Sequence, residues 1–121
     1  IEKKLINPYY GGTLDLRLRV NNKVYIYDFK TSNNIQPKHF IQLAAYKYSI
    51  ENYYGIIIDG GVSILKIDKN KPYCKEYLLS FSIPDNVLYI NYCTDLFFSL
   101  LYTYYNNLRV EKNFKSIILK K

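Results

Sequence analysis

Two alternating strand patterns separated by two asparagines constrain the fold of this chain more than any other feature. Residues 11–20 (GGTLDLRLRV) and residues 23–30 (KVYIYDFK) each alternate apolar and polar side chains with the period of a β-strand. Asn21 and Asn22 tolerate the positive φ of a two-residue hairpin turn. The two segments are therefore expected to form one antiparallel hairpin.

The two-residue loop fixes the register of this hairpin. Counting back from the loop gives the expected pairs Val20 with Lys23, Leu18 with Tyr25, Leu16 with Tyr27, and Asp15 with Asp28. Opposed residues have Cβ atoms about 5 Å apart, so two ionised carboxylates there would repel by about 3 kcal/mol at an effective dielectric constant of about 20. Lys30 supplies one positive charge on that face, and two carboxylates suit a hard divalent cation such as Mg²⁺. The alternative is an edge hairpin whose acids point into water.

The segment after the hairpin, residues 31–52, is predicted to be a helix. It begins with residues that cap helices and carries Pro37 near the first turn. Gln42 and Tyr46 are four residues apart and lie one turn above each other. The helical period predicts an apolar face of Phe40, Ile41, Ala44, Ala45 and Tyr48, and a polar face of His39, Gln42, Tyr46 and Ser49.

The remaining segments predict further strands and a second helix. We expect an opening strand at residues 1–6, a second hairpin of residues 53–58 and 62–67 joined by residues 59–61, a strand at residues 75–83, and a helix over residues 85–108. Asp85 is expected to cap this helix, whose apolar faces are expected to pack on the sheet. The residues from Arg109 onward have no assigned structure.

Composition is compatible with an intracellular protein whose positive charge serves general solubility or binds a polyanion. The formal net charge is +7, which matches a nucleic-acid-binding surface. No apolar run reaches the roughly 20 residues of a membrane span, and no segment resembles a signal peptide. Cys74 and Cys93 lack metal-ligand spacing and are expected to be free thiols. His39, the single histidine, is expected to be a surface residue. The chain contains no methionine, so we expect a trimmed domain that lacks its N-terminal part.

Three short motifs resemble, in order, those of the PD-(D/E)XK nuclease superfamily and in particular its RecB-like exonuclease branch. The family combines a strand bearing G-x-x-D, a strand bearing D-x-K, and a helix bearing Q-x-x-x-Y. Here the matching residues run from Gly12 to Asp15, from Asp28 to Lys30, and from Gln42 to Tyr46. The resemblance implies a single nuclease domain over residues 1–121, of α/β class, with a restriction-endonuclease-like mixed central β-sheet flanked by α-helices.

The resemblance also implies a metal-dependent deoxyribonuclease site, used in DNA repair, recombination or phage DNA processing, often beside a fused or associated helicase. Asp15, Asp28 and the backbone carbonyl of Phe29 would bind Mg²⁺ or Mn²⁺. Lys30 would orient the attacking water, and Gln42 and Tyr46 would support the site. Many relatives have a further acid or histidine upstream, where this chain offers only Glu2. The iron–sulfur cluster of some relatives needs four cysteines and is not predicted.

Two other functions fit the same residues. One is a DNA-binding module without catalytic activity, which would bind DNA in a salt-sensitive way whether or not Mg²⁺ is present. The other is a structural domain whose acidic hairpin binds a metal only for stability, so that metal would raise the melting temperature and leave DNA intact.

Overall fold

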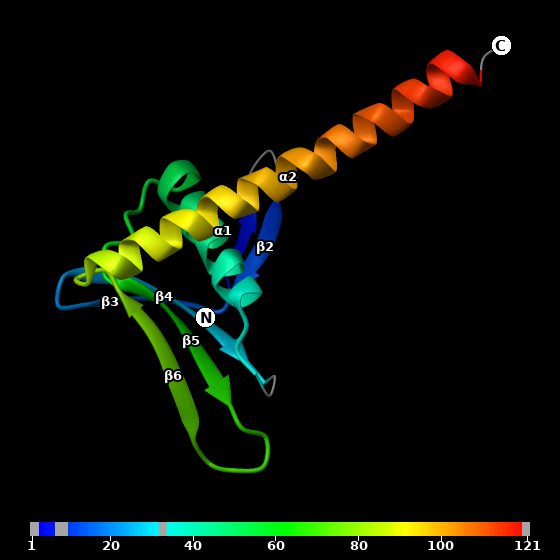
Figure 1. Cartoon of the computed structure of the whole chain (residues 1–121). Coiled ribbons are helices and arrows are strands. Elements are labelled where there is room, and N and C mark those ends of the chain that lie inside the picture. The colour runs from blue at the N-terminus through cyan, green and yellow to red at the C-terminus, as the bar shows by residue number, and fades with distance from the viewer. Residues whose placement is uncertain (1–2, 7–9, 32–33, 120–121) are drawn as a thin grey trace.

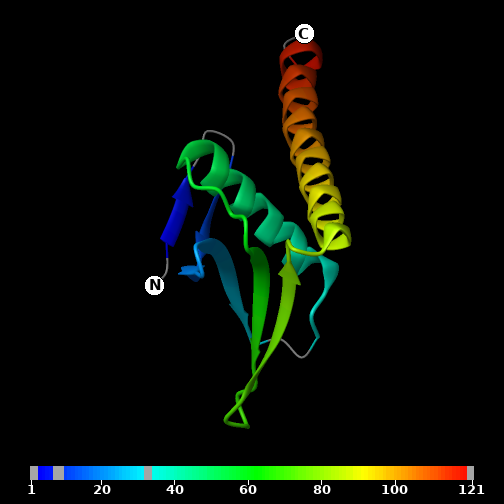
Figure 2. The ribbon, with the colours of Figure 1, turned by 90° about the vertical axis from the view of Figure 1, so that its left-hand side faces the viewer.

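The computed structural model describes residues 3–6, 10–31 and 34–119 and has six strands and two helices in these ranges (Figures 1 and 2). In chain order they are β1 (Lys3–Ile6), β2 (Gly11–Leu14), β3 (Leu16–Val20), β4 (Lys23–Lys30), α1 (Pro37–Tyr53), β5 (Gly61–Ile67), β6 (Cys74–Ser80) and α2 (Pro84–Ile118). Glu2 lies outside the described residues.

The strands β3, β4, β5 and β6 form a mixed four-stranded sheet in that order, so the chain is of α/β class. β4 and β5 are parallel, and the other neighbours are antiparallel. Parallel neighbours need a crossover connection, which α1 provides between β4 and β5. β1 and β2 form a separate antiparallel pair.

The hairpin predicted around the two asparagines is confirmed. Asn21 and Asn22 have φ angles of 51° and 65°, as a two-residue hairpin turn requires. The pairs of Val20 with Lys23, Leu18 with Tyr25 and Leu16 with Tyr27 are those expected from the sequence. The prediction of one continuous first strand was wrong, because the strand divides at Asp15 into β2 and β3. The division brings Leu14 into the core, whereas Leu18 is exposed on the far side of the sheet.

One face of the sheet packs against α1, and α2 packs on the other side of α1 (Figure 2). Val24, Ile26 and Asp28 point from β4 into this layer, where Leu43 and Ile50 of α1 are fully buried. The polar helix face is largely buried, since α1 is covered from two sides: His39, Tyr46 and Ser49 are all buried. The expectation that α2 packs chiefly on the sheet was also wrong, because its first half lies on α1 and only its start contacts β6.

The second predicted hairpin does not form. Residues 53–58 comprise the end of α1 and a loop that contains Gly55 at a φ of 69°, and β5 pairs instead with β6. Ile58 is buried, but its amide donates a hydrogen bond to the Glu51 carboxylate (3.0 Å) and takes no part in a ladder. The apolar run Ile56–Ile58 therefore packs as a loop that leads into β5.

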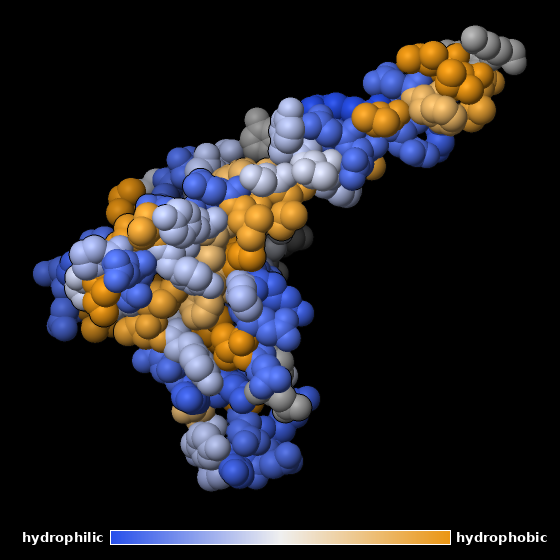
Figure 3. Space-filling view, viewed as in Figure 1, coloured by the Kyte–Doolittle hydropathy of each residue, from blue (hydrophilic) through white to orange (hydrophobic). Residues whose placement is uncertain are grey.

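Helix α2 is longer than predicted and begins earlier. Its N-cap is Ile83, Asp85 lies in the first turn, and the residues after Arg109 continue the helix to Ile118. The second half extends away from the rest of the molecule (Figures 1 and 3). In the described ranges, neither helix is long and apolar enough to cross a membrane.

The face of the sheet opposite α1 is apolar and partly exposed. In the part of the chain that the structure describes, neither α1 nor α2 lies over this face. Its more exposed side chains come from all four strands: Leu18, Val20, Phe29, Ile67 and Leu78.

Candidate functional site

Asp28 is the buried acid at the centre of the candidate site. It lies on β4 between Ile26 and Lys30 on the α1 side of the sheet, and only 4% of its surface is exposed. Its atom Oδ2 is buried, and Lys30 Nζ lies 2.9 Å from it. A buried carboxylate is unfavourable unless positive charge compensates it.

Asp15 lies beside Asp28, although not as the ladder partner that the register predicts. Leu16 and Tyr27 are the last pair of the β3–β4 ladder, and Asp15 follows at the break between β2 and β3. Its Oδ2 accepts a hydrogen bond from the backbone amide of Phe29 (2.7 Å). This bond holds the Asp15 carboxylate against β4 next to Asp28.

The two carboxyl groups and Lys30 set the charge of the site. Burial, and next the neighbouring Asp15 carboxyl, raise the pKa of Asp28 to about 6, although Lys30 acts in the opposite direction. Lys30 Nζ lies 2.9 Å from Asp28 Oδ2 in an ion pair. The site thus lacks enough positive charge to keep Asp28 ionised over the usual range of an aspartate.

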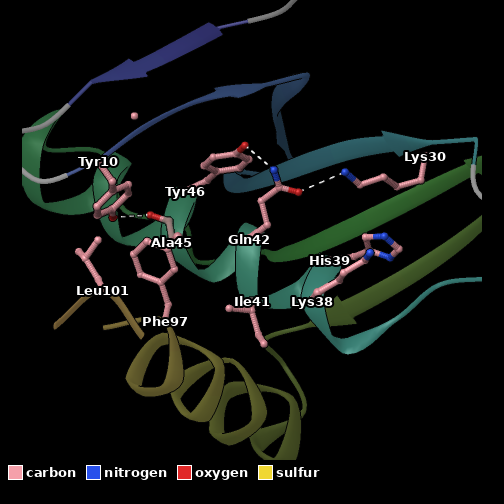
Figure 4. A pocket seen from close by; sticks show the side chains of 11 residues that line it. Tyr10, Lys30, Lys38, His39, Ile41, Gln42, Ala45, Tyr46, Phe97 and Leu101 are labelled. Atoms are coloured by element: carbon pink, nitrogen blue, oxygen red, sulfur yellow. Dashed lines mark hydrogen bonds between the residues drawn. The ribbon is translucent and has the colours of Figure 1, made fainter. Parts of the chain in front are cut away.

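A chain of hydrogen bonds connects Lys30 to helix α1. Lys30 Nζ donates to Gln42 Oε1 (3.1 Å), and Gln42 Nε2 donates to the Tyr46 hydroxyl (2.8 Å) (Figure 4). The Tyr46 ring lies directly against Gly12, where an added Cβ would stand 2.4 Å from its Cε1 atom. Glycine at this position therefore lets the β2 backbone approach the ring. All three sequence motifs meet through these contacts.

Phe29 contributes its backbone rather than its side chain. The ring is partly exposed on the opposite face of the sheet, and the amide is bonded to Asp15. A role of the Phe29 carbonyl as a metal ligand stays a prediction.

The donor set fits a hard divalent cation. Asp15 and Asp28 offer two adjacent carboxylates, and the Asp28 carboxylate is buried. Nowhere in the described ranges do three or more histidine, cysteine, aspartate or glutamate side chains gather into a metal-binding group. The described protein ligands would thus be the two carboxylates and backbone oxygen.

His39 is buried, not a surface residue as predicted. Its Nδ1 accepts a hydrogen bond from the Gln36 amide (3.0 Å), which closes the first turn of α1. Burial, followed by the charges of Lys30 and Lys38, lowers the pKa of His39. The ring is therefore neutral at pH 7. Cys74 and Cys93 are free thiols, as expected.

Beside the carboxylates, the structure has a pocket of about 620 Å³ that sequence reasoning did not find (Figure 4). Lys30 and Gln42 line it together with Lys38, Tyr10 and Phe97. These last three residues come from three separate segments and belong to no motif, so only the folded chain brings them together.

Comparison with known proteins adds no relative to this description. No family model, curated protein or solved structure matches the chain.

Proposed function

We propose that the chain is a metal-dependent deoxyribonuclease, an exonuclease of the RecB-like branch of the PD-(D/E)XK superfamily, with a restriction-endonuclease-like fold. One observation carries the proposal: the Asp28 carboxyl is buried beside the Asp15 carboxyl, with the Lys30 ammonium 2.9 Å from its Oδ2. Burying a carboxyl group in a hydrophobic layer lowers the stability of the fold. A catalytic role would explain why this chain keeps one there. The mixed α/β sheet and the meeting of the three motifs support the same proposal.

Asp15, Asp28 and the Phe29 carbonyl would hold Mg²⁺, or Mn²⁺ in its place. Bound there, the cation would lower the pKa of a water molecule and stabilise negative charge on the phosphate. The backbone amide of Phe29 keeps Asp15 turned towards Asp28, so the two carboxylates are oriented before any ligand arrives.

Lys30 would orient the attacking water and stabilise the charge that develops on the phosphate oxygens. The Lys30 ammonium has three N–H donors and uses one of them in its hydrogen bond to Gln42. Gln42 is in turn held by its own hydrogen bond to the Tyr46 hydroxyl. Gln42 and Tyr46 are therefore positioning residues. They would act by keeping Lys30 directed at the substrate.

The partner would be DNA in an intracellular setting. A net charge of +7 favours association with a phosphate backbone. Repair, recombination and phage or viral DNA processing all use an exonuclease of this kind, with a fused or associated helicase as a further expected partner.

A second candidate is a DNA-binding module without catalytic activity. The 2.9 Å ion pair of Lys30 with Asp28 favours it, because this pair compensates the buried acid without any metal. In that case DNA binding would be indifferent to Mg²⁺ and to substitution of Asp28.

The test is cleavage of end-labelled linear and closed circular DNA in Mg²⁺, Mn²⁺ or EDTA. The wild-type chain is expected to degrade linear DNA only with metal and to spare circles. Asp28→Asn and Lys30→Ala should each reduce the rate at least about 100-fold, since each removes charge at the reacting phosphate.

Matched controls are Asp95→Asn and Lys112→Ala, which make the same changes on exposed parts of α2 and should cleave like wild type. Equal cleavage by wild type and Asp28→Asn would refute the nuclease. If every variant leaves DNA intact but binds it, the binding module takes its place. If metal raises the melting temperature and DNA stays intact and unbound, the chain is instead a structural domain that binds metal for stability.

A further inference from the structure

The pocket beside the carboxylates has two ends of different chemistry (Figure 4). Lys30, Lys38 and His39 lie at one end, and Tyr10, Phe97 and Leu101 lie at the other. Its volume of about 620 Å³ falls within the range of small-molecule sites. A ligand that fills it would combine an anionic group with an apolar group.

The aromatic end is held in place by its own contacts. The rings of Tyr10 and Phe97 meet edge to face, with centroids 4.8 Å apart. The Tyr10 hydroxyl donates a hydrogen bond to the carbonyl of Ala45 on α1 (2.7 Å). A planar ring that enters the pocket would therefore meet aromatic side chains that are already fixed in position.

The cationic end suits a phosphate group. Lys38 is exposed at the first turn of α1, and Lys30 reaches the pocket from β4. His39 adds no charge at pH 7, because burial and the two lysines lower its pKa. The two lysines are thus the cations that an anionic group would meet in this pocket.

Lys30 belongs both to this pocket and to the carboxylate site. It lines the pocket and forms the 2.9 Å ion pair with Asp28. A strand whose phosphodiester lies at Asp28 would therefore adjoin the pocket at Lys30.

We infer that the pocket binds one unpaired nucleotide of the DNA strand, with its phosphate at Lys30 and Lys38 and its base against Tyr10 and Phe97. The inference rests on the proposed function, since it takes DNA as the ligand. A base must leave its partner to enter, because pairing and stacking in a duplex cover its edge and faces. The chain therefore prefers single strands or frayed ends over closed duplex.

The test measures binding, not cleavage, so that it is independent of the nuclease reaction. Fluorescence anisotropy with a labelled single strand and the matching duplex is recorded in EDTA. Wild type is expected to bind the single strand more tightly. Phe97→Leu, which keeps an apolar side chain but removes the ring, should weaken single-strand binding about tenfold and change duplex binding little.

Phe114→Leu is the matched control, because it makes the same change at an exposed ring on the far part of α2 that does not line the pocket. It should bind within about twofold of wild type. Lys38→Gln should weaken single-strand binding more than Lys112→Gln, which removes the same charge from the far part of α2. Thermal melting by circular dichroism checks that each variant is folded.

Changes in the DNA give a second, independent measurement. Abasic nucleotides are placed one at a time along the single strand. One position should weaken binding to wild type and not to Phe97→Leu. Equal affinity for every abasic strand, a Phe97→Leu variant that binds like wild type, or absence of any single-strand binding would each overturn the inference. Metal-dependent cleavage abolished by Asp28→Asn would still support the nuclease in those cases.

Discussion

The two faces of β4 differ in which kinds of side chain they bury and expose. On the α1 side a charged residue, Asp28, is buried together with Val24 and Ile26. On the other side Tyr27 is only partly buried and Phe29 is exposed. Exposed apolar residues are common in proteins, whereas a buried carboxylate calls for a specific explanation. The α1 side of β4 is therefore the candidate functional side.

The largest expected effect tests which face supports the fold. Ile26→Ala removes a fully buried side chain from the core and should lower the free energy of unfolding by about 2–4 kcal/mol. Leu18→Ala, on the exposed face, should cost less than about 1 kcal/mol. Urea unfolding of both variants measures the difference. Similar losses would mean that the exposed face is covered in solution.

A smaller effect is expected from Gly12→Ala, which tests the contact between β2 and α1. The added Cβ would collide with the Tyr46 ring, so we expect a loss of about 1–3 kcal/mol and weaker cleavage as Gln42 loses its partner. In a Tyr46→Ala background the same substitution should cost little. A double-mutant cycle by urea unfolding measures this coupling, and additive losses would argue against the contact.

The smallest effect concerns pH. The pKa of Asp28, about 6 in the folded chain, is above its unfolded value of 3.8, so the folded state keeps a proton that the unfolded state releases. The free energy of unfolding should therefore fall as pH rises from about 4 to about 6, by about 1–2 kcal/mol after allowance for solvent screening.

Unfolding in EDTA at a series of pH values, compared with Asp28→Asn, measures this decrease. The variant does not titrate at position 28 and should lack it, whereas Asp95→Asn should follow wild type. If the free energy of unfolding of Asp28→Asn falls by the same amount, another titrating group causes the fall. Mg²⁺ should offset the loss in wild type by binding the ionised carboxylates.

The hairpin was predictable because its information is local. Two asparagines at positive φ fix both turn type and register, which brings Asp15 and Asp28 to the same end of the hairpin. The four-residue spacing of Gln42 and Tyr46 likewise predicts their place on one helix face. The break at Asp15 was not predictable, because residues 11–14 alternate like the strand that follows and the sequence does not reveal that they pair with β1.

The errors concern segments whose partners are distant in sequence. Residues 56–58 are as apolar as a strand, and the sequence does not reveal that β5 takes β4 and β6 as neighbours. His39 and Ser49 are polar by type, but α1 lies between the sheet and α2, where such residues are buried. The pocket was missed for the same reason, since Tyr10, Lys38 and Phe97 lie far apart along the chain.

Helix α2 spans 35 residues, or about 50 Å, and only its first half packs on the rest of the molecule. From Asn107 to Leu119 every residue is exposed. This part needs no nucleation of its own, because the anchored half supplies the first turns and only propagation remains. Glu111 and Lys115 are four residues apart, a favourable spacing for an ion pair on a helix. Lys115 also lies in the last turn, where a positive charge interacts favourably with the helix dipole. Helical order should therefore decline turn by turn towards Ile118, without a single cooperative step.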